Sequence, residues 1–381
     1  MSSALLLGWL SVFGGIDRPA GLPDHPKSAG AVQAARIEAV VRAWHEAGKF
    51  NGTVLVADAG EIVWQGGFGP AVREWDRPNG PDVRYPICSL TKQFTAHLVM
   101  QAVERGDLAL DGVITDYLPD YRSETGRKVT IRHLLSHASG LPEVETELFF
   151  DPRPEAEDVA KVVTKFGSGD LTFEPGSASQ YGNTDYFVLQ AILERVSGSS
   201  FETLLEEKIV KPLGLRATGI ARRDAIIPKR ANDYTRSGDG WTRTAPYQWE
   251  NWGGAGGLYS TVGDLHLWNR ALVGHTLVSE STTRTMWTPV EKLGYVGLGS
   301  WVYTRGLPGV EARPKIVERR GAIGGFAILN VIVPETQRWM VILSNHYNED
   351  IHTLPYADCL PLDLLLVLYG GEPKGPPATA K

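Results

Sequence analysis

The stretch "ICSLTKQFTA", residues 87–96, decides the fold, because a short apolar run ends there and a helix begins. Ser89 and Lys92 stand three residues apart at this junction. Apolar residues recur after it at helical spacing, and Gly106 is a typical stop, so the pattern predicts a helix from Ser89 to Arg105. Residues i and i+3 share one face of a helix, so Lys92 can reach the Ser89 oxygen.

This pair of residue types points to nucleophilic catalysis. A serine hydroxyl is a poor nucleophile at neutral pH and needs a base in contact with it. Lysine is a base only when it is neutral, and burial and the positive potential of a helix N-terminus both lower its pKa. Taken alone, Ser89 and Lys92 also fit an N-capping serine beside a solvated lysine. For the adjacent Cys88 we favour a buried thiol at the end of a strand.

A second motif lies in "SQYGNTDY", residues 179–186, which places Tyr181 and Asn183 two apart in a turn before a helix over 184–196. Positions i and i+2 of an extended segment point the same way. A phenol can relay a proton, and an amide both donates and accepts hydrogen bonds. A surface turn with an asparagine helix cap is the alternative. The combination with the first motif favours a shared catalytic site.

Both ends of the chain predict parts of one sheet. Apolar spacing predicts an amphipathic helix over residues 31–49, strands over 52–58 and 61–68, a hairpin within 324–345 and a closing helix over 356–369. Strands at the two ends of the chain, with none predicted between, suggest that one sheet is built from both.

The middle of the chain is helical in character, with short helices between Pro- and Gly-containing loops. We therefore expect an α/β fold. Residues 31–106 and 291–370 would form a discontinuous sheet domain, and 107–290 a helical domain beside it. Residues 1–30 would be a separate N-terminal segment, and 371–381 a tail.

Composition limits the partners. The chain has 381 residues, 43% of them hydrophobic, and a formal net charge of -6 without a cluster of Lys or Arg, which argues against a nucleic-acid or anionic-membrane surface. No stretch reaches the roughly 18 apolar residues of a membrane span. The N-terminal "SALLLGWLSVFGG" is similar to a signal-peptide core but lacks a preceding Lys or Arg, so a cytoplasmic and an exported protein both remain open.

Longer stretches carry a family resemblance that covers roughly residues 35–365. They include "SLTKQFTAHLVMQAVERGDLALDGVITDYLPDY", "VTIRHLLSHASGLP", "FEPGSASQYGNTDYFVLQAILERVSG" and "GGAGGLYSTVGDLHLWNRAL". The chain resembles the serine β-lactamase and penicillin-binding-protein superfamily, in its class C and esterase-like branch. The resemblance implies a β-lactamase-like fold, an antiparallel sheet flanked by helices, with the active site between the sheet and a helical insertion.

The resemblance also implies roles for the two motifs. Ser89 matches the serine that is acylated, and Lys92 matches its base. Tyr181 matches the tyrosine that shares the proton transfer. Asn183 matches the amide that holds the lysine and the substrate.

The third family motif, usually Lys-Thr-Gly or His-x-Gly, corresponds here to Arg319-Arg320-Gly321. Gly321 would let a substrate backbone approach the strand closely. Arg319 keeps a cation, so it could bind a substrate carboxylate. The oxyanion hole would consist of the backbone N–H groups of Ser89 and Ala322.

Two further features have competing interpretations. The aromatic stretch 247–260 would lie near the rim of the site, where Trp252 either stacks on the substrate or packs in the core. His133 and His137 have the i, i+4 spacing of metal ligands, but no Glu follows His133 and no third ligand is visible. We favour helix packing for these histidines, and we expect neither a metal nor a cofactor.

We therefore predict a serine hydrolase that forms an acyl-enzyme at Ser89 on a small-molecule ester or amide. A carboxylesterase for short-chain esters is favoured, because the third motif departs from both usual forms. A β-lactamase and a D-amino-acid peptidase are the alternative enzymes. A protein that binds penicillin or peptidoglycan without turnover is the alternative of another class.

Overall fold

The computed structural model describes residues 27–143, 159–165, 167–238, 240–244, 247–290 and 292–377. The signal-like N-terminal stretch lies outside these residues. Within the described part of the chain, no helix is long and apolar enough to cross a lipid bilayer.

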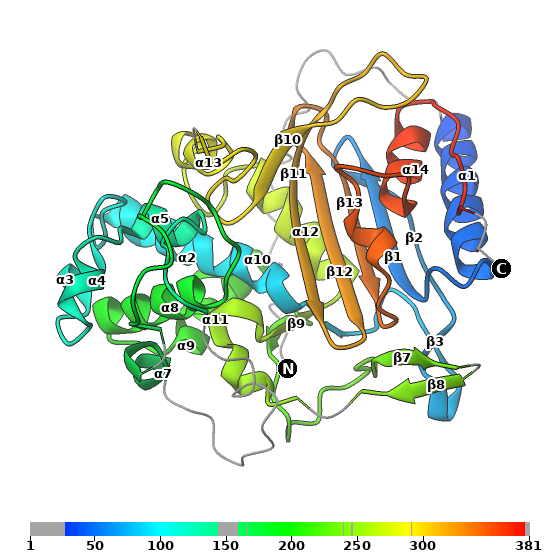
Figure 1. Ribbon diagram of the computed structural model, residues 1–381. Coiled ribbons are helices and arrows are strands. Elements are labelled where there is room, and N and C mark those ends of the chain that lie inside the picture. Colours follow the sequence, from blue (N-terminus) through cyan, green and yellow to red (C-terminus); the bar gives the residue numbers. More distant parts are fainter. Residues whose placement is uncertain are drawn as a thin grey trace, which may run out of the picture.

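A six-stranded antiparallel sheet is built from both ends of the chain (Figure 1). Its order is β10-β11-β12-β13-β1-β2, so a strand from the N-terminal part pairs with a strand from the C-terminal part. The register at this junction runs from Gly52 opposite Ser344 to Ala57 opposite Trp339. The strands are β1 (Gly52–Asp58), β2 (Glu61–Phe68), β10 (Trp301–Thr304), β11 (Lys315–Ile323), β12 (Phe326–Val333) and β13 (Arg338–Ser344).

Alternation along the central strands divides the core between the two faces of the sheet. Every residue of β12 is buried; Ile328 and Ile332 belong to one hydrophobic cluster, and Leu329 and Val331 to the other. This is the period of two expected for a strand covered on both faces. Helix α12 (Val262–Val273) contacts β1 and β13, whereas α1 (Lys27–Glu46) packs against β2 and α14 (Leu360–Leu368).

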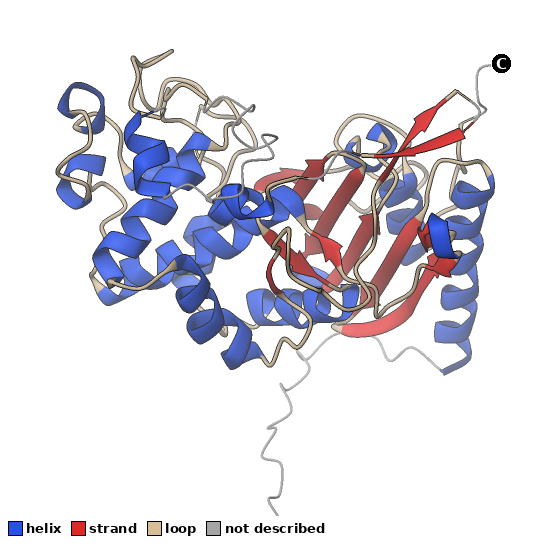
Figure 2. Ribbon diagram, turned by 90° about the horizontal axis from the view of Figure 1, so that it is seen from below, coloured by secondary structure: helices blue, strands red, loops and turns tan. Residues whose placement is uncertain are grey.

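The helical part lies beside the sheet (Figure 2). Its centre is α2 (Thr91–Arg105), which packs against α8 (Thr184–Ser197) and α11 (Gly253–Gly256). The other helices are α3 (Ile114–Tyr117), α4 (Ser123–Gly126), α5 (Ile131–Leu135), α7 (Val159–Lys165), α9 (Phe201–Leu205), α10 (Lys211–Leu213) and α13 (Glu280–Met286).

The chain also contains short strands, between residues 70 and 260, that the sequence did not predict. A small sheet has the order β5-β9-β6, and two hairpins pair β3 with β4 and β7 with β8. Packing also crosses the expected domain boundaries, since α2 lies with the helices and α12 covers the sheet. The short strands are β3 (Pro70–Val72), β4 (Arg77–Pro78), β5 (Tyr85–Pro86), β6 (Gly219–Ile220), β7 (Tyr234–Ser237), β8 (Gly240–Arg243) and β9 (Leu258–Ser260).

The start of α2 meets β11 at close range. A 3-10 turn, η2 (Cys88–Leu90), precedes the helix and packs against the strand. A Cβ on Gly321 would lie 2.6 Å from the Ile87 carbonyl oxygen and 2.9 Å from the Ser89 nitrogen, so only glycine allows this approach. Because β10 pairs only with residues 315–318, the second half of β11 has no partner among the described strands on that side.

Candidate active site

Ser89 is half-buried in the turn before α2, and the residue before it has an unusual backbone. Cys88 has φ +50°, a left-handed conformation that costs a non-glycine residue about 1–3 kcal/mol. Its side chain is fully buried, and burial followed by the negative charge of Asp233 raises the pKa of the Cys88 thiol well above its usual value. Cys88 is therefore a buried, protonated thiol beside the serine, as the sequence predicts.

Lys92 is fully buried, and its ammonium nitrogen has three oxygen neighbours. Nζ lies 3.2 Å from Ser89 Oγ, 2.8 Å from Asn183 Oδ1 and 2.7 Å from the Ala255 carbonyl oxygen. Burial lowers the pKa of Lys92, and the positive charge of Arg319 lowers it further, although Tyr181 opposes the shift. The neutral form of Lys92 is therefore more populated in the protein than it would be in water at the same pH.

The three neighbours determine how a neutral Lys92 is oriented. The oxygens of Asn183 and Ala255 can only accept hydrogen bonds, so they take the two protons of the neutral amine. The remaining lone pair then faces the Ser89 hydroxyl. This is the arrangement that a general base for serine requires.

Tyr181 reaches the same hydroxyl from the segment just before α8. Its OH donates a hydrogen bond to Ser89 Oγ at 2.7 Å, and the residue is 46% exposed. Neighbouring groups partly desolvate the phenol oxygen, which opposes ionisation, but the positive charges of Lys92 and Arg319 outweigh this effect, so the pKa of Tyr181 is lowered overall. Ser89 therefore lies between two groups that can exchange its proton.

Arg319 lies beneath the site rather than at its surface. The side chain is fully buried; Nε donates to the Ser89 carbonyl oxygen at 3.1 Å, and the two terminal nitrogens lie 3.3 and 3.4 Å from His137 Nε2. The guanidinium stacks 4.1 Å from the Trp301 ring centroid and 5.4 Å from that of Tyr181. No ion pair between described residues involves Arg319. This placement differs from the solvent-facing carboxylate receptor that the sequence suggested.

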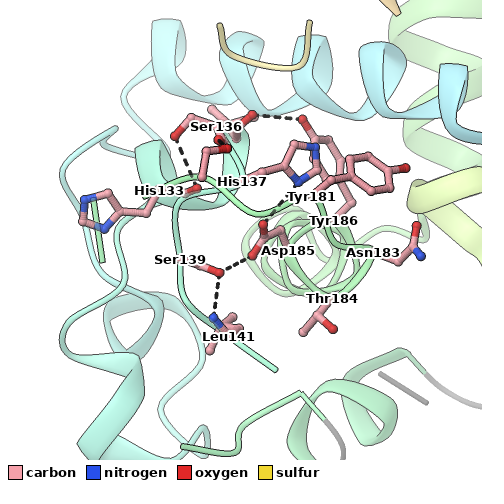
Figure 3. Close-up of polar contacts among 12 residues, drawn as sticks. His133, Ser136, His137, Ser139, Leu141, Tyr181, Asn183, Thr184, Asp185 and Tyr186 are labelled. Atoms are coloured by element: carbon pink, nitrogen blue, oxygen red, sulfur yellow. Dashed lines mark hydrogen bonds and ion pairs between the residues drawn. The ribbon is translucent and has the colours of Figure 1, made fainter. Parts of the chain in front are cut away.

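His137, which contacts Arg319, belongs to a buried polar cluster with Asp185 and Ser139 (Figure 3). Because a guanidinium only donates, His137 Nε2 accepts and Nδ1 carries the proton. This Nδ1 lies 3.3 Å from Asp185 Oδ2, an ion-pair distance without hydrogen-bond alignment, and Ser139 donates to the other oxygen of Asp185. Burial, and then the positive charge of Arg319, keeps the pKa of His137 well below its usual value, so the ring is neutral.

The two histidines of the candidate metal pair have different partners. His133 Nδ1 accepts a hydrogen bond from the Thr130 N–H at the start of α5, whereas His137 faces Arg319 and Asp185. Among the residues that the structure describes, no three His, Cys, Asp or Glu side chains gather as metal ligands would. The separate protein contacts of the two rings are those of packed histidines.

The remaining expected residues lie on β11 and in the aromatic stretch before α11. Gly321 and Ala322 follow Arg319 on β11, with Ala322 exposed, so the oxyanion hole stays a prediction that the geometry allows. Trp252 is only 6% exposed and belongs to the main core, and its neighbour Trp249 is buried there as well. This burial favours the packing interpretation of Trp252, and its contact with substrate stays a prediction.

One residue that the sequence analysis missed is Glu143. Its carboxylate accepts hydrogen bonds from the Asn183 N–H at 2.7 Å and from Asn183 Nδ2 at 2.8 Å. An acidic residue is favourable at a helix N-terminus, but Glu143 is 40 residues before the helix that it contacts. No local sequence signal could have revealed this contact.

Comparisons with known proteins show the family to which the chain belongs. The family profile described as Beta-lactamase matches residues 37–357. The chain is 29% identical over 319 residues to Penicillin-binding protein 4* of Bacillus subtilis (strain 168), a match that covers 78% of this chain and 68% of that protein. It is 33% identical over 201 residues to Esterase EstB of Burkholderia gladioli, covering 49% and 51% of the two chains. The crystal structure of a penicillin-binding protein from Bacillus halodurans superposes with a TM-score of 0.71 at 26% identity, covering 82% of this chain and 95% of that one.

Proposed function

This chain belongs to the Beta-lactamase family, and we propose that it is a carboxylesterase that forms an acyl-enzyme at Ser89 on neutral, short-chain esters. Its fold is the β-lactamase-like combination of an antiparallel sheet with packed helices, and it is a serine hydrolase of this superfamily. The identity of the substrate and the roles of individual residues are the proposal.

The first half-reaction follows from the contacts of Ser89. Its oxygen attacks the ester carbonyl carbon while its proton passes to the lone pair of neutral Lys92. The carbonyl oxygen becomes an oxyanion, which the N–H groups of Ser89 and Ala322 would stabilise. The intermediate collapses when the carbon–oxygen bond to the alcohol breaks and the alcohol takes a proton from Tyr181 or Lys92. The products are the free alcohol and the acyl-Ser89 ester.

The second half-reaction returns the enzyme to its starting state. A water molecule attacks the acyl carbon and gives a proton to the Lys92–Tyr181 pair. The bond to Ser89 Oγ then breaks, Ser89 regains a proton, and the carboxylic acid leaves. Both proton carriers lie within 3.2 Å of Ser89 Oγ, so no rearrangement of the chain is required.

The burial of Arg319 is the single observation that carries the choice of a neutral ester. A penicillin or a peptide C-terminus presents a carboxylate next to the reacting carbonyl, and a cation on this strand is the natural partner for it. Here Arg319 is enclosed by aromatic rings, and the next cation, Arg320, pairs with Glu318. A substrate without a carboxylate needs neither cation. The identity to a relative that is named an esterase supports the same choice.

A D-amino-acid peptidase is the second candidate, and one observation favours it. Residues 319–323 of β11 have no partner among the described strands on the β10 side, so an extended peptide could add there by backbone hydrogen bonds. The similarity to Penicillin-binding protein 4* supports this candidate as well.

A side-by-side rate panel tests the proposal. Nitrophenyl esters of increasing acyl length, a chromogenic cephalosporin and D-alanyl peptides are each assayed with the native protein and with Ser89→Ala. We expect the highest kcat/KM on short esters and no turnover by the variant. A higher kcat/KM on the cephalosporin or the peptides would overturn the esterase assignment. A stable acyl-protein without turnover of any substrate would indicate the binding function instead.

A further inference from the structure

We propose that Glu143 is a positioning residue of the catalytic site, which holds the side-chain amide of Asn183 in the orientation that Lys92 needs. The inference rests on the proposed role of Lys92 as the base. It concerns a residue that does not touch Ser89 and that carries no role in the mechanism above.

The N-terminus of α8 is capped in an unusual way. Asn183 occupies the N-cap position, where asparagine commonly accepts a hydrogen bond from its own helix. Here Asn183 has helical backbone angles, φ -86° and ψ -30°, and its side chain makes no capping bond. The carboxylate of Glu143 receives the backbone N–H of Asn183 instead, at 2.7 and 2.9 Å from its two oxygens, and that of Thr184 at 3.4 Å. Because Glu143 caps the helix, the Asn183 side chain is not used for capping and can contact Lys92 instead.

The released amide is then held at both ends. A carboxylate can only accept, so the NH2 of Asn183 faces Glu143, at 2.8 Å from Nδ2 to Oε1. The carbonyl end, Oδ1, accepts from Lys92 Nζ at 2.8 Å. Turning the amide over would place its oxygen against the carboxylate and its NH2 against the protons of Lys92. Glu143 therefore selects one of the two amide orientations.

This orientation of the Asn183 amide directs the lone pair of Lys92 toward Ser89. A neutral Lys92 has two protons, and the oxygens of Asn183 and Ala255 accept them, which leaves the lone pair on the side of Ser89. Without Glu143 the amide of Asn183 can turn, and one of the two fixed acceptors is lost. The lone pair of Lys92 then spends part of its time directed away from Ser89.

Glu143 also affects Lys92 through its charge, which gives the test a second readout. The negative charge of Glu143 works against the lowering of the Lys92 pKa. Removing that charge lowers the pKa of Lys92 further, so the neutral amine persists to lower pH. The other charged or titratable groups that face Lys92 come from η2, from the loop after α5, from α8 and its N-terminal turn, and from β11: Cys88, His137, Tyr181, Asp185, Tyr186 and Arg319.

The experiment compares Glu143→Gln, Glu143→Ala and Glu143→Asp on a nitrophenyl ester across pH. Glu104→Gln is the matched control, because Glu104 accepts the N–H of Ser279 at the start of α13, away from the site, at 2.8 Å. For Glu143→Ala we expect kcat to fall roughly 10- to 100-fold with KM little changed. The acid limb of kcat/KM should move to lower pH in the Gln and Ala variants and stay in place in Glu143→Asp, which should recover part of kcat.

Two results would overturn this inference while the proposed function stands. One is kinetics of the Glu143 variants that match Glu104→Gln. The other is a loss of kcat that follows a loss of thermal stability and leaves the acid limb in place, since that would indicate a structural role only. Activity that survives Lys92→Ala would instead refute the proposed base, which separates the two failures.

Discussion

The Nε of Arg319 lies 3.1 Å from the backbone carbonyl oxygen of Ser89, so a buried cation stabilises the turn that carries Ser89. Its guanidinium also lies against the faces of Tyr181 and Trp301. Arg319 thus stabilises the positions of Ser89 and Tyr181.

We expect Arg319→Ala to lower kcat/KM on neutral esters and on substrates with a carboxylate by similar factors. The reason is that the buried guanidinium acts on Ser89 and Tyr181, which both reactions use. The decrease in kcat/KM should correspond to about 1.5–3 kcal/mol, the free energy that a hydrogen bond from a charged group contributes. The measurement is the ratio of kcat/KM for a matched pair of esters, one carrying a carboxylate. A loss confined to the carboxylated ester would show that Arg319 binds substrate after all.

Covalent labelling identifies the nucleophile. Ser89→Ala should abolish ester hydrolysis and labelling by a serine-directed phosphonate, because the Ser89 hydroxyl is the nucleophile that lies 3.2 Å from Lys92 Nζ and 2.7 Å from the Tyr181 hydroxyl. Cys88→Ala should retain much of the activity, since the Cys88 thiol is buried and its pKa is raised. Mass spectrometry of the labelled peptide distinguishes the two, and a label on Cys88 would contradict the assignment.

Lys92 and Tyr181 should behave as one unit. Lys92→Ala and Tyr181→Phe are each expected to lower kcat by roughly 10²–10⁴, the range for a lost proton-transfer group. The double variant should lose much less than the product of the two factors, because both groups act on the same Ser89 proton. Rates of all four proteins on one ester give the coupling. Multiplicative losses would mean that the two groups act independently.

Asp185→Asn should change how stability depends on pH. Burial raises the pKa of Asp185 well above its usual 3.8, in spite of the hydrogen bond from Ser139. The folded protein therefore keeps a proton that the unfolded chain loses, so the free energy of unfolding falls as pH rises from about 3.8 toward the raised value, by up to roughly 1.4 kcal/mol per pH unit. Asn keeps the oxygen acceptor but has no proton to lose.

Urea unfolding of both proteins from acid to neutral pH measures this difference. The variant should show the flatter curve and gain stability relative to the native protein as pH rises. Parallel curves would mean that Asp185 is ionised in the folded state.

The parts that sequence reasoning predicted correctly are those that a single local pattern specifies. Ser89 and Lys92 are in contact because one helical turn separates them, and β12 and β13 follow from two apolar runs around a turn. The position of the Arg319 side chain, in contrast, could not be predicted from a local pattern. Its residue type suggested a receptor for carboxylates, but its burial depends on rings from separate elements, Tyr181 and Trp301.

Other misses have the same origin. Strands β5 and β6 have two residues each, too short for any periodicity, and they exist only because β9 lies between them. The sequence did not decide whether Trp252 packs in the core or contacts substrate, because an aromatic residue suits both places. Only the packing of α11 and its neighbours determines where the ring lies.

The position of β1 between β2 and β13 has a consequence for biosynthesis. As the chain leaves the ribosome, the N-terminal hairpin of β1 and β2 emerges early, but the inner edge of β1 has no partner until Ser344 has been made. Contacts so distant in sequence slow folding, and an unprotected strand edge invites pairing with other chains. Until β13 has been made, the seven residues of β1, most of them apolar, therefore leave newly made chains prone to pairing with one another.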